Sequence, residues 1–301
     1  MKDEDARITM NADGIIGDIS YFVPKSISTI ASTQPKQEEL RQSGNDKSMV
    51  EEAFSNLPNL IRLVVHDIHP PVIPKRREPD AYSQPRAPIV LSALQQNNRL
   101  EPLILHHAHL SSLAKTHRMP SLQPILSNVT HFGLGHMNFG PLATTLEPWN
   151  NTTNLGGLSA FLRLLVNLES LSLDLAWCTS YDVTYGRCIT EALQQQKLRK
   201  LSLAKMDYDV RELCSLFTWH RNTLENLTLT KLSGWSGIWK EVFVLLRNNV
   251  TGLEKIEIKN LRQNKDAKWI YFPQYSPINQ TLLAEGNNVG RLLAMAMQYQ
   301  I

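Results

Sequence analysis

The sequence predicts an α/β fold in which helices and parallel strands alternate along the chain, and three observations support this prediction. The apolar pattern Leu-x-x-Leu-x-Leu recurs, its copies begin at fairly regular intervals, and most copies follow an apolar run at helical spacing. Apolar residues three and four positions apart line one face of a helix, whereas alternating apolar residues line one face of a strand. A repeated helix–strand unit places parallel strands in one layer and helices in another.

The copies of the pattern are clearest in the second half of the chain: Leu168-Leu171-Leu173, Leu198-Leu201-Leu203, Leu224-Leu227-Leu229 and Leu253-Ile256-Ile258. Looser copies upstream are Leu60-Leu63-Val65, Leu100-Leu103-Leu105 and Val129-Phe132-Leu134. The copies begin 30, 26 and 29 residues apart from Leu168 onward, and 40, 29 and 39 residues apart before it. Because leucine-rich repeats run to about 20–29 residues, we predict a leucine-rich repeat solenoid with parallel strands on the concave side and helices on the convex side. An ordinary α/β domain with leucine-rich strands is the alternative.

Apolar runs at helical spacing precede most of the predicted strands. Those before Leu168, Leu224 and Leu253 are, in order, Leu158-Phe161-Leu162-Leu165, Val210-Leu213-Leu216-Phe217 and Trp239-Val242-Phe243-Leu246. Further helices are expected at 47–55 and 89–96, and Trp269 to Phe272 is expected to form a strand bounded by Pro273.

Two inserts explain the long intervals between repeats. Residues 70–88 are rich in proline and charge, and residues 138–154 are rich in Asn, Thr, Gly and Pro, so both are expected to be surface loops. Residues 1–45 form a polar N-terminal segment with little periodicity, which is expected either to be poorly ordered or to form short strands against the first repeat.

The remainder of the chain, residues 46–301, is assigned to one leucine-rich repeat domain. A solenoid needs an atypical element at its end to cover the open core. Residues 261–301 are therefore predicted to be a capping segment, and the apolar spacing in residues 288–300 predicts that it ends in a helix.

Composition excludes several classes of partner. With 301 residues and 42% hydrophobic content, the chain is long enough to bury one continuous core. Its net charge is +3 and its pI about 8.7, and the largest basic cluster, Lys75-Arg76-Arg77, lies in a proline-rich stretch, so we expect no nucleic-acid partner. No apolar run approaches the roughly 20 residues of a membrane span, so we expect no membrane association.

Cysteine content and the N-terminus point to an intracellular protein. The cysteines Cys178, Cys188 and Cys214 are odd in number and widely spaced, which is typical of a reducing compartment. The acidic start at Met1 is not followed by the apolar stretch of a secretory signal. We therefore expect the protein in the cytoplasm or the nucleus.

The histidines are the only cluster that suggests chemistry: His66, His69, His106, His107, His109, His131 and His136. A metal site would require supporting cysteine or carboxylate ligands, and none stands at suitable spacing. No nucleophile–base arrangement or carboxylate pair stands out either. We therefore predict a protein that is not an enzyme, with no catalytic residue, no cofactor and no metal.

The register of the repeats predicts a binding face. In each strand the residues beside and between the inward apolar pair alternate outward, onto the concave side. The predicted protein-binding residues are Arg62, Val64, His66, Ile104, His106, His131, Ser170, Ser172, Asp174, Lys200, Ser202, Asn226, Thr228, Lys255, Glu257 and Lys259. Gly133 occupies the same outward register. The alternative is that this face is merely solvated or is covered by a terminal segment.

Several stretches, taken in order, resemble one known family: Leu146-Glu147-Pro148-Trp149, Leu168 to Leu173, Trp177 to Asp182, Leu198 to Leu203 and His220 to Leu224. Over about residues 50–260 the chain resembles fungal F-box/leucine-rich-repeat proteins. The resemblance implies a substrate receptor of a cullin-type (SCF) ubiquitin ligase, in which an F-box docks the ligase adaptor and the repeats hold the substrate.

The chain departs from this family at its start. An F-box of that type opens with Leu-Pro and a helical run of Leu, Ile and Val, whereas residues 1–45 show no such run and Leu57-Pro58 belongs to a repeat. Adaptor binding is therefore expected only if an F-box lies upstream of Met1. A fragment, a gene model without its first exon, and a repeat protein that has lost the F-box are the explanations left open.

The sequence therefore predicts a non-enzymatic scaffold that binds a protein on its concave face, with substrate recognition for a ubiquitin ligase as the role implied by the resemblance. The alternative is a ubiquitin-independent regulator, or binding partner, of an enzyme or a GTPase through the same face.

Overall fold

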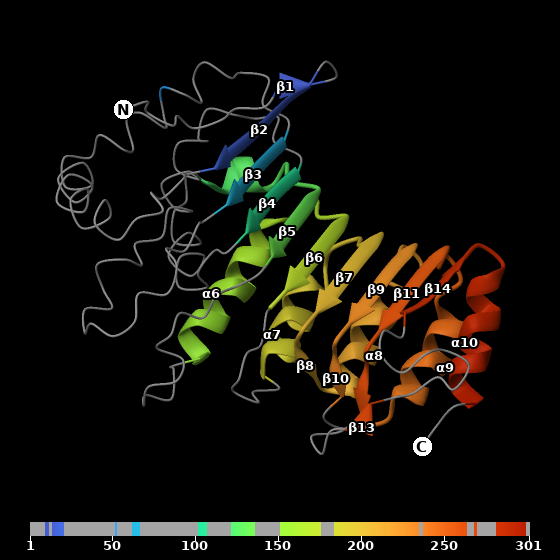
Figure 1. Cartoon of the computed structure of the whole chain (residues 1–301). Coiled ribbons are helices and arrows are strands. Elements are labelled where there is room, and N and C mark those ends of the chain that lie inside the picture. The colour runs from blue at the N-terminus through green and yellow to red at the C-terminus, as the bar shows by residue number, and fades with distance from the viewer. Residues whose placement is uncertain are drawn as a thin grey trace, which may run out of the picture.

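The chain is a mixed α/β protein with a mostly parallel sheet (Figure 1). The structure, a computed structural model, describes residues 10–11, 14–20, 52, 62–66, 102–106, 122–135, 151–175, 184–234, 237–263, 268–269 and 281–298. The strands are β1 Met10–Asn11, β2 Gly14–Ser20, β3 Arg62–His66, β4 Pro102–His106, β5 His131–Gly135, β6 Ser170–Asp174, β7 Lys200–Ala204, β8 Asp207–Tyr208, β9 Asn226–Thr230, β10 Ser233–Gly234, β11 Lys255–Lys259, β12 Arg262–Gln263, β13 Lys268–Trp269 and β14 Thr281–Glu285. The helices are α5 Gln123–Leu126, α6 Asn151–Leu164, α7 Thr184–Leu193, α8 Val210–Trp219, α9 Trp239–Asn249 and α10 Asn288–Gln298.

The large sheet has the strand order β1-β2-β3-β4-β5-β6-β7-β9-β11-β14. Strands β2 to β11 run parallel, and only the end strands β1 and β14 run antiparallel to their neighbours. The inward apolar residues meet in register, since Leu171 pairs with Leu201, Leu201 with Leu227, and Leu227 with Ile256. The adjacency of these strands, which the sequence predicted, is confirmed.

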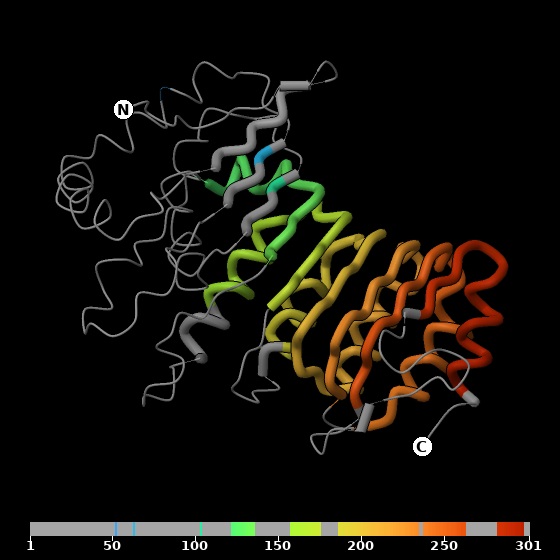
Figure 2. Tube along the Cα trace, viewed as in Figure 1, coloured from blue at the N-terminus to red at the C-terminus, as the bar shows by residue number. Residues whose placement is uncertain are grey.

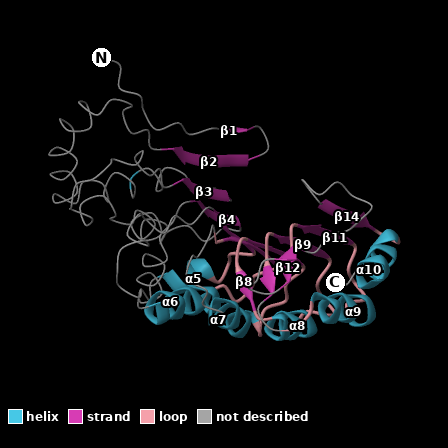
Figure 3. Ribbon diagram, turned by 60° about the horizontal axis from the view of Figure 1, so that its bottom comes forward, coloured by secondary structure: helices cyan, strands magenta, loops and turns pink. Residues whose placement is uncertain are grey.

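The helices cover one face of this sheet, where they lie side by side in chain order (Figure 3). The path from helix to strand repeats from α6 to the end of the described chain (Figure 2). Each helix turns its apolar positions toward the sheet, as in α8, where Val210, Leu213, Leu216 and Phe217 are buried. The buried helix and strand residues form one continuous core. Because each buried leucine contributes about 1.5–3 kcal/mol, this core is the main stabilising term.

A second, smaller sheet, which the sequence did not predict, has the order β13-β12-β10-β8. Its strands β8, β10 and β12 are parallel, and each comes shortly after a strand of the large sheet. Between the two strands the chain turns at a residue with positive φ: Lys205 (56°), Lys231 (53°) or Asn260 (52°). The residue after each turn is buried: Met206, Leu232 or Leu261. The positive φ therefore redirects the chain so that a third apolar residue per repeat enters the core.

Two sequence expectations need correction. The insert at 138–154 was expected to be a loop throughout, but α6 begins at Asn151. Asn and Thr are poor residues for a helix interior, yet they suit the first turn, where backbone N–H groups lack helical partners. The strand expected at Trp269 to Phe272 begins instead at Lys268, and its described part, β13, pairs with β12.

Other sequence expectations lie outside the described residues. These are the insert at 70–88, the expected helix at 89–96, and all but Glu52 of the expected helix at 47–55. Among the described residues, β2 lies parallel to β3 as part of the large sheet. The helices that the structure describes include none with the length and apolar character needed to cross a bilayer.

A glycine in α7 makes room for the largest polar side chain of the core. A Cβ placed on Gly186 would lie 2.8 Å from Cδ1 and 2.9 Å from Cε1 of Tyr208. The Tyr208 ring is fully buried, and its hydroxyl is 2.7 Å from Oγ1 of Thr190. The ring is therefore held at its far end while its edge rests on the helix backbone, so it has little freedom to move away.

Replacing this glycine should destabilise the fold. Gly186→Ala is expected to lower the free energy of unfolding by about 1–3 kcal/mol, because overpacking outweighs the better helix propensity of alanine. Gly290→Ala in α10 is the matched control, since its Cβ would meet nothing within 4 Å; it should raise stability by up to about 1 kcal/mol. Urea denaturation of both variants measures this, and shifts of the same sign would contradict it.

The lysine turns allow a second test. An L-residue in the left-handed region costs roughly 1–2 kcal/mol, a cost that glycine avoids at some loss of chain entropy. Lys231→Gly is therefore expected to raise the free energy of unfolding by up to about 1 kcal/mol. Thr228→Gly, three residues earlier in the extended strand β9, should lower it by a similar amount. A lower stability for both variants would show that the turn is not strained.

Candidate binding face

The face of the large sheet away from the helices is here called the open face. Within the described residues, no helix lies on it (Figure 3). Its side chains on β5 to β11 alternate with the buried core residues and are all exposed or half-buried: His131, Ser170, Ser172, Asp174, Lys200, Ser202, Ala204, Asn226, Thr228, Thr230, Lys255, Glu257 and Lys259.

Strand pairing arranges these side chains in three rows that run across the sheet, as the repeat register predicted. The rows are Ser170-Lys200-Asn226-Lys255, Ser172-Ser202-Thr228-Glu257 and Asp174-Ala204-Thr230-Lys259. The middle row is short and hydroxylic until it reaches Glu257. A partner backbone could approach the sheet closely there, because no long side chain stands between.

The N-terminal part of the predicted face is described only in its backbone. In register, β3 pairs with β4, and His66 lies opposite His106. The side chains of Arg62, Val64, His66, Ile104 and His106 lie outside the described part of the structure.

One predicted position on this face needs correction. Gly133, which was expected to contribute outward surface in the middle of β5, is buried. Glycine has no side chain that could extend beyond the neighbouring residues, so the middle of β5 exposes little surface on this face.

Ion pairs tie neighbouring strands together along the edges of the open face. Arg199 donates from Nε and Nη2 to Oε1 of Glu225, at 2.9 and 2.6 Å, and this bond raises the pKa of the guanidinium. Nζ of Lys205 lies 2.8 Å from Oδ2 of Asp174. Lys255 pairs with Glu285, which raises the pKa of the lysine. The Arg199–Glu225 and Lys255–Glu285 pairs are exposed and therefore worth little stability, whereas the Lys205–Asp174 pair is partly buried.

Three lysines of this region have no acidic partner among the described residues. No acidic group lies within salt-bridge distance of Lys200, Lys231 or Lys259 in the part of the chain that the structure describes. Lys231 and Lys259 are neighbours across β9 and β11, since the Lys231 N–H donates to the Lys259 carbonyl at 2.7 Å. Beside its hydroxylic middle row, the open face therefore carries positive charge that has no acidic partner among the described residues.

The sequence prediction missed the contribution of Lys231, because it considered only strand residues. The signal was present, since Lys205 and Lys231 each follow the third outward residue of their repeat by one position. The Arg199–Glu225 pair was also foreseeable, because both residues directly precede the first outward residue of adjacent strands.

Behind the sheet, His220 is a buried polar group with an unusual environment. It caps the C-terminus of α8 and is 1% exposed, and neither ring nitrogen has a hydrogen-bond partner of normal geometry. Burial lowers the pKa of this histidine to about 4, although the nearby Leu193 carbonyl opposes the shift. The ring is therefore neutral near pH 7, so His220 does not act as a cation at the C-terminal end of α8.

The remaining described groups offer little catalytic chemistry. Burial raises the pKa of the Cys214 thiol to about 11, so this sulfur is protonated and a poor nucleophile. The described residues include no group of three or more side chains able to hold a metal ion. Cys178 lies outside them, as do all of residues 176–183. What the described geometry does provide is the polar surface of the open face.

Comparison with models of known protein families finds no match to this sequence, and comparison with curated proteins finds no significant match either.

The buried histidine predicts a pH dependence of stability. In the unfolded chain a histidine titrates near 6.5, whereas His220 in the fold titrates near 4. As the pH falls between these values, the histidine of the unfolded chain binds a proton while His220 in the fold does not. The contribution of His220 to the free energy of unfolding is therefore fully present above about pH 6.5 and is lost as the pH drops toward 4. The loss from this residue should reach about 3 kcal/mol.

Variants isolate this contribution from that of the carboxylates. His220→Gln should flatten the fall in the free energy of unfolding between pH 7 and pH 4, measured by urea denaturation at each pH. His131→Gln, at an exposed position on β5, should leave the curve parallel to that of the wild type. Equal slopes for all three proteins would refute the assignment to His220.

Proposed function

We propose that this chain is a leucine-rich repeat solenoid that acts as a non-enzymatic scaffold and binds a protein partner on the open face, which is its concave side. The observation that supports this most directly is the register. The same three outward positions of successive repeats are adjacent on neighbouring strands, so the chain builds one extended surface out of small units.

The composition of the face supports recognition of a protein rather than a small molecule. The surface is broad and polar, and short hydroxylic residues occupy its middle row. Lys200, Lys231 and Lys259, which have no acidic partner within the described part of the chain, favour a partner that presents acidic groups. A cytoplasmic or nuclear location, as the sequence suggests, suits this role.

The resemblance to F-box/leucine-rich-repeat proteins gives the proposal a specific form, in which the partner is a substrate of a cullin-type ubiquitin ligase. This form requires an F-box encoded upstream of Met1. Without one, the same face would serve a regulator or binding partner of an enzyme or a GTPase, and ubiquitin would play no part.

Charge reversal tests the face. Partners are recovered from native cells on tagged wild-type protein and quantified by mass spectrometry. The double variant Lys200→Glu, Lys259→Glu should reduce recovery of the specific partner at least tenfold, since each reversal replaces attraction with repulsion. Lys259 is preferable to Lys255 for this purpose because Lys255 is already paired with Glu285.

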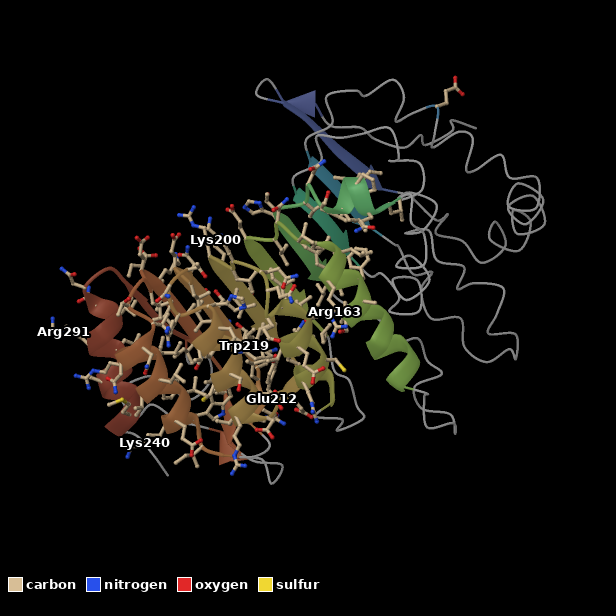
Figure 4. All side chains as sticks on the ribbon, turned by 180° about the vertical axis from the view of Figure 1, so that it is seen from behind. Arg163, Lys200, Glu212, Trp219, Lys240 and Arg291 are labelled. Atoms are coloured by element: carbon tan, nitrogen blue, oxygen red, sulfur yellow. The ribbon has the colours of Figure 1, made fainter. Side chains whose placement is uncertain are left out.

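A matched control separates the face from net charge. The double variant Lys240→Glu, Arg291→Glu makes the same change in net charge at exposed basic residues of α9 and α10, far from Lys200 (Figure 4), and it should leave recovery unchanged. Equal recovery with all three proteins would refute binding through the open face. Recovery of a cullin-ligase adaptor, when any upstream coding sequence is included, supports the ligase form, and its absence leaves the regulator form.

A further inference from the structure

Strand β14 forms one edge of the large sheet within the described residues. It pairs with β11 on one side, and no described strand lies on the other. Its central residue, Leu283, is 55% exposed, whereas its neighbours Leu282 and Ala284 are buried in the core. A large apolar side chain thus stands on the open face at the sheet edge.

The hydrogen bonds of β11 show which way the backbone of β14 points. The Lys255 N–H donates to the Glu225 carbonyl, and the Lys259 carbonyl accepts from the Lys231 N–H. In a strand, alternate residues direct both backbone groups to the same side. Lys255, Glu257 and Lys259 therefore bond to β9, which leaves the groups of Ile256 and Ile258 for β14.

The partners of these isoleucines follow from the register. Ile256 lies opposite Ala284, and Ile258 lies opposite Leu282. The Gly286 N–H donates to the Glu254 carbonyl at 2.7 Å, which fits the same alternation. Consequently the backbone N–H and C=O groups of the other three residues, Thr281, Leu283 and Glu285, point away from β11 toward the outer edge.

This edge lacks the features that usually protect an edge strand from pairing. Proteins block such edges with proline, bulges or charged side chains. β14 contains no proline, its five residues pair with β11 without a bulge, and the charge of Glu285 is matched by Lys255. The backbone groups at this edge are therefore suited to accept another strand.

We propose that a second copy of this chain pairs with this edge, so that two β14 strands run antiparallel about a two-fold axis at Leu283. In this register Leu283 faces Leu283 of the second copy, and the two residues exchange both backbone hydrogen bonds. Thr281 faces Glu285 of the second copy on either side. All outward backbone groups of the strand are then satisfied, and the two large sheets become one.

The side chains of β14 favour β14 of a second copy as the strand that pairs with this edge. A two-fold pairing requires a self-complementary patch, and the centre of β14 is a single apolar residue that meets itself. In the row of side chains that crosses the new junction, Lys255 and Glu285 of one copy would be followed by Thr281 and Lys259 of the other copy. Each Glu285 would therefore have a lysine on either side of it in this row. Like charges never stand directly opposite each other in this register.

Disulfide trapping tests the register directly. Cα atoms of a hydrogen-bonded antiparallel pair lie about 5.5 Å apart, within the range that a disulfide spans. Mild oxidation of Leu283→Cys should therefore give a covalent dimer in high yield on a non-reducing gel. Val166→Cys, at a side chain of matching exposure (56%) on the α6–β6 connection, should give only the background of the wild type. Equal yields for the two variants would overturn the proposal.

Charge repulsion provides an independent test. By light scattering after size exclusion, the wild-type protein should approach twice the chain mass of 34.2 kDa as its concentration rises. Leu283→Glu places two like charges at the axis, each beside Glu257 of its own copy, and should remain at the single-chain mass, whereas Val166→Glu should dimerise like the wild type. Because both positions are exposed, thermal unfolding should show that each variant is folded. A wild type that stays monomeric at high micromolar concentration, or a dimer that persists in Leu283→Glu, would overturn the proposal. A heterologous strand as the true occupant would give this monomeric result.

Discussion

The inward apolar pair of each repeat is the constraint on which the rest of the structure depends. A strand in a parallel sheet that slips by one residue turns its core side chains outward, so two buried residues per strand fix the register strictly. Leu201 and Leu203, for example, are at most 2% exposed and lie level with the pairs on both neighbouring strands. The register in turn fixes every outward row, including those of the candidate binding face.

Polar groups inside the protein also connect one helix–strand unit to the next. A helix ends with carbonyl groups that have no helical partner, and in a stack of repeats these ends face the neighbouring unit. Nε2 of the buried Gln196, just after α7, donates to the Leu162 carbonyl near the end of α6. His220 occupies a comparable place after α8, near the Leu193 carbonyl of α7, but without a hydrogen bond of normal geometry. The Gln196 hydrogen bond therefore adds to the apolar contact between α6 and α7.

Sequence periodicity predicted the large sheet because alternation and helical spacing are local signals. The paired rows from Ser170 to Lys255 followed from that register alone. Periodicity could not show the turns at Lys205 and Lys231, because lysine is uncommon at positive φ and nothing in its neighbours marks the turn. The second sheet was missed for a related reason, since strands of two residues, such as Asp207–Tyr208, leave no detectable pattern.

The candidate face was predicted in its positions but not in its electrostatics. Whether a lysine is available to a partner depends on contacts between repeats, such as that of Lys205 with Asp174, which are 31 residues apart. The sequence treats Lys200, Lys255 and Lys259 alike, whereas in the structure only Lys255 has an acidic partner among the described residues. The strand β14 was not foreseen either, because its sequence Thr-Leu-Leu-Ala-Glu follows no repeat pattern and contains residues with good helix propensity.

The C-terminal end shows that closing a core and closing a sheet are separate requirements. Leu282 and Ala284 take the inward places that another repeat would fill, and the turn at Gly286, with φ 56°, leads directly into α10. Val289, Leu293 and Ala296 then cover the helix layer. The apolar core is thus covered while the outer backbone groups of β14 keep no described partner, so the hydrophobic constraint is met at this end and the hydrogen-bonding constraint is the one that the proposed second copy would meet.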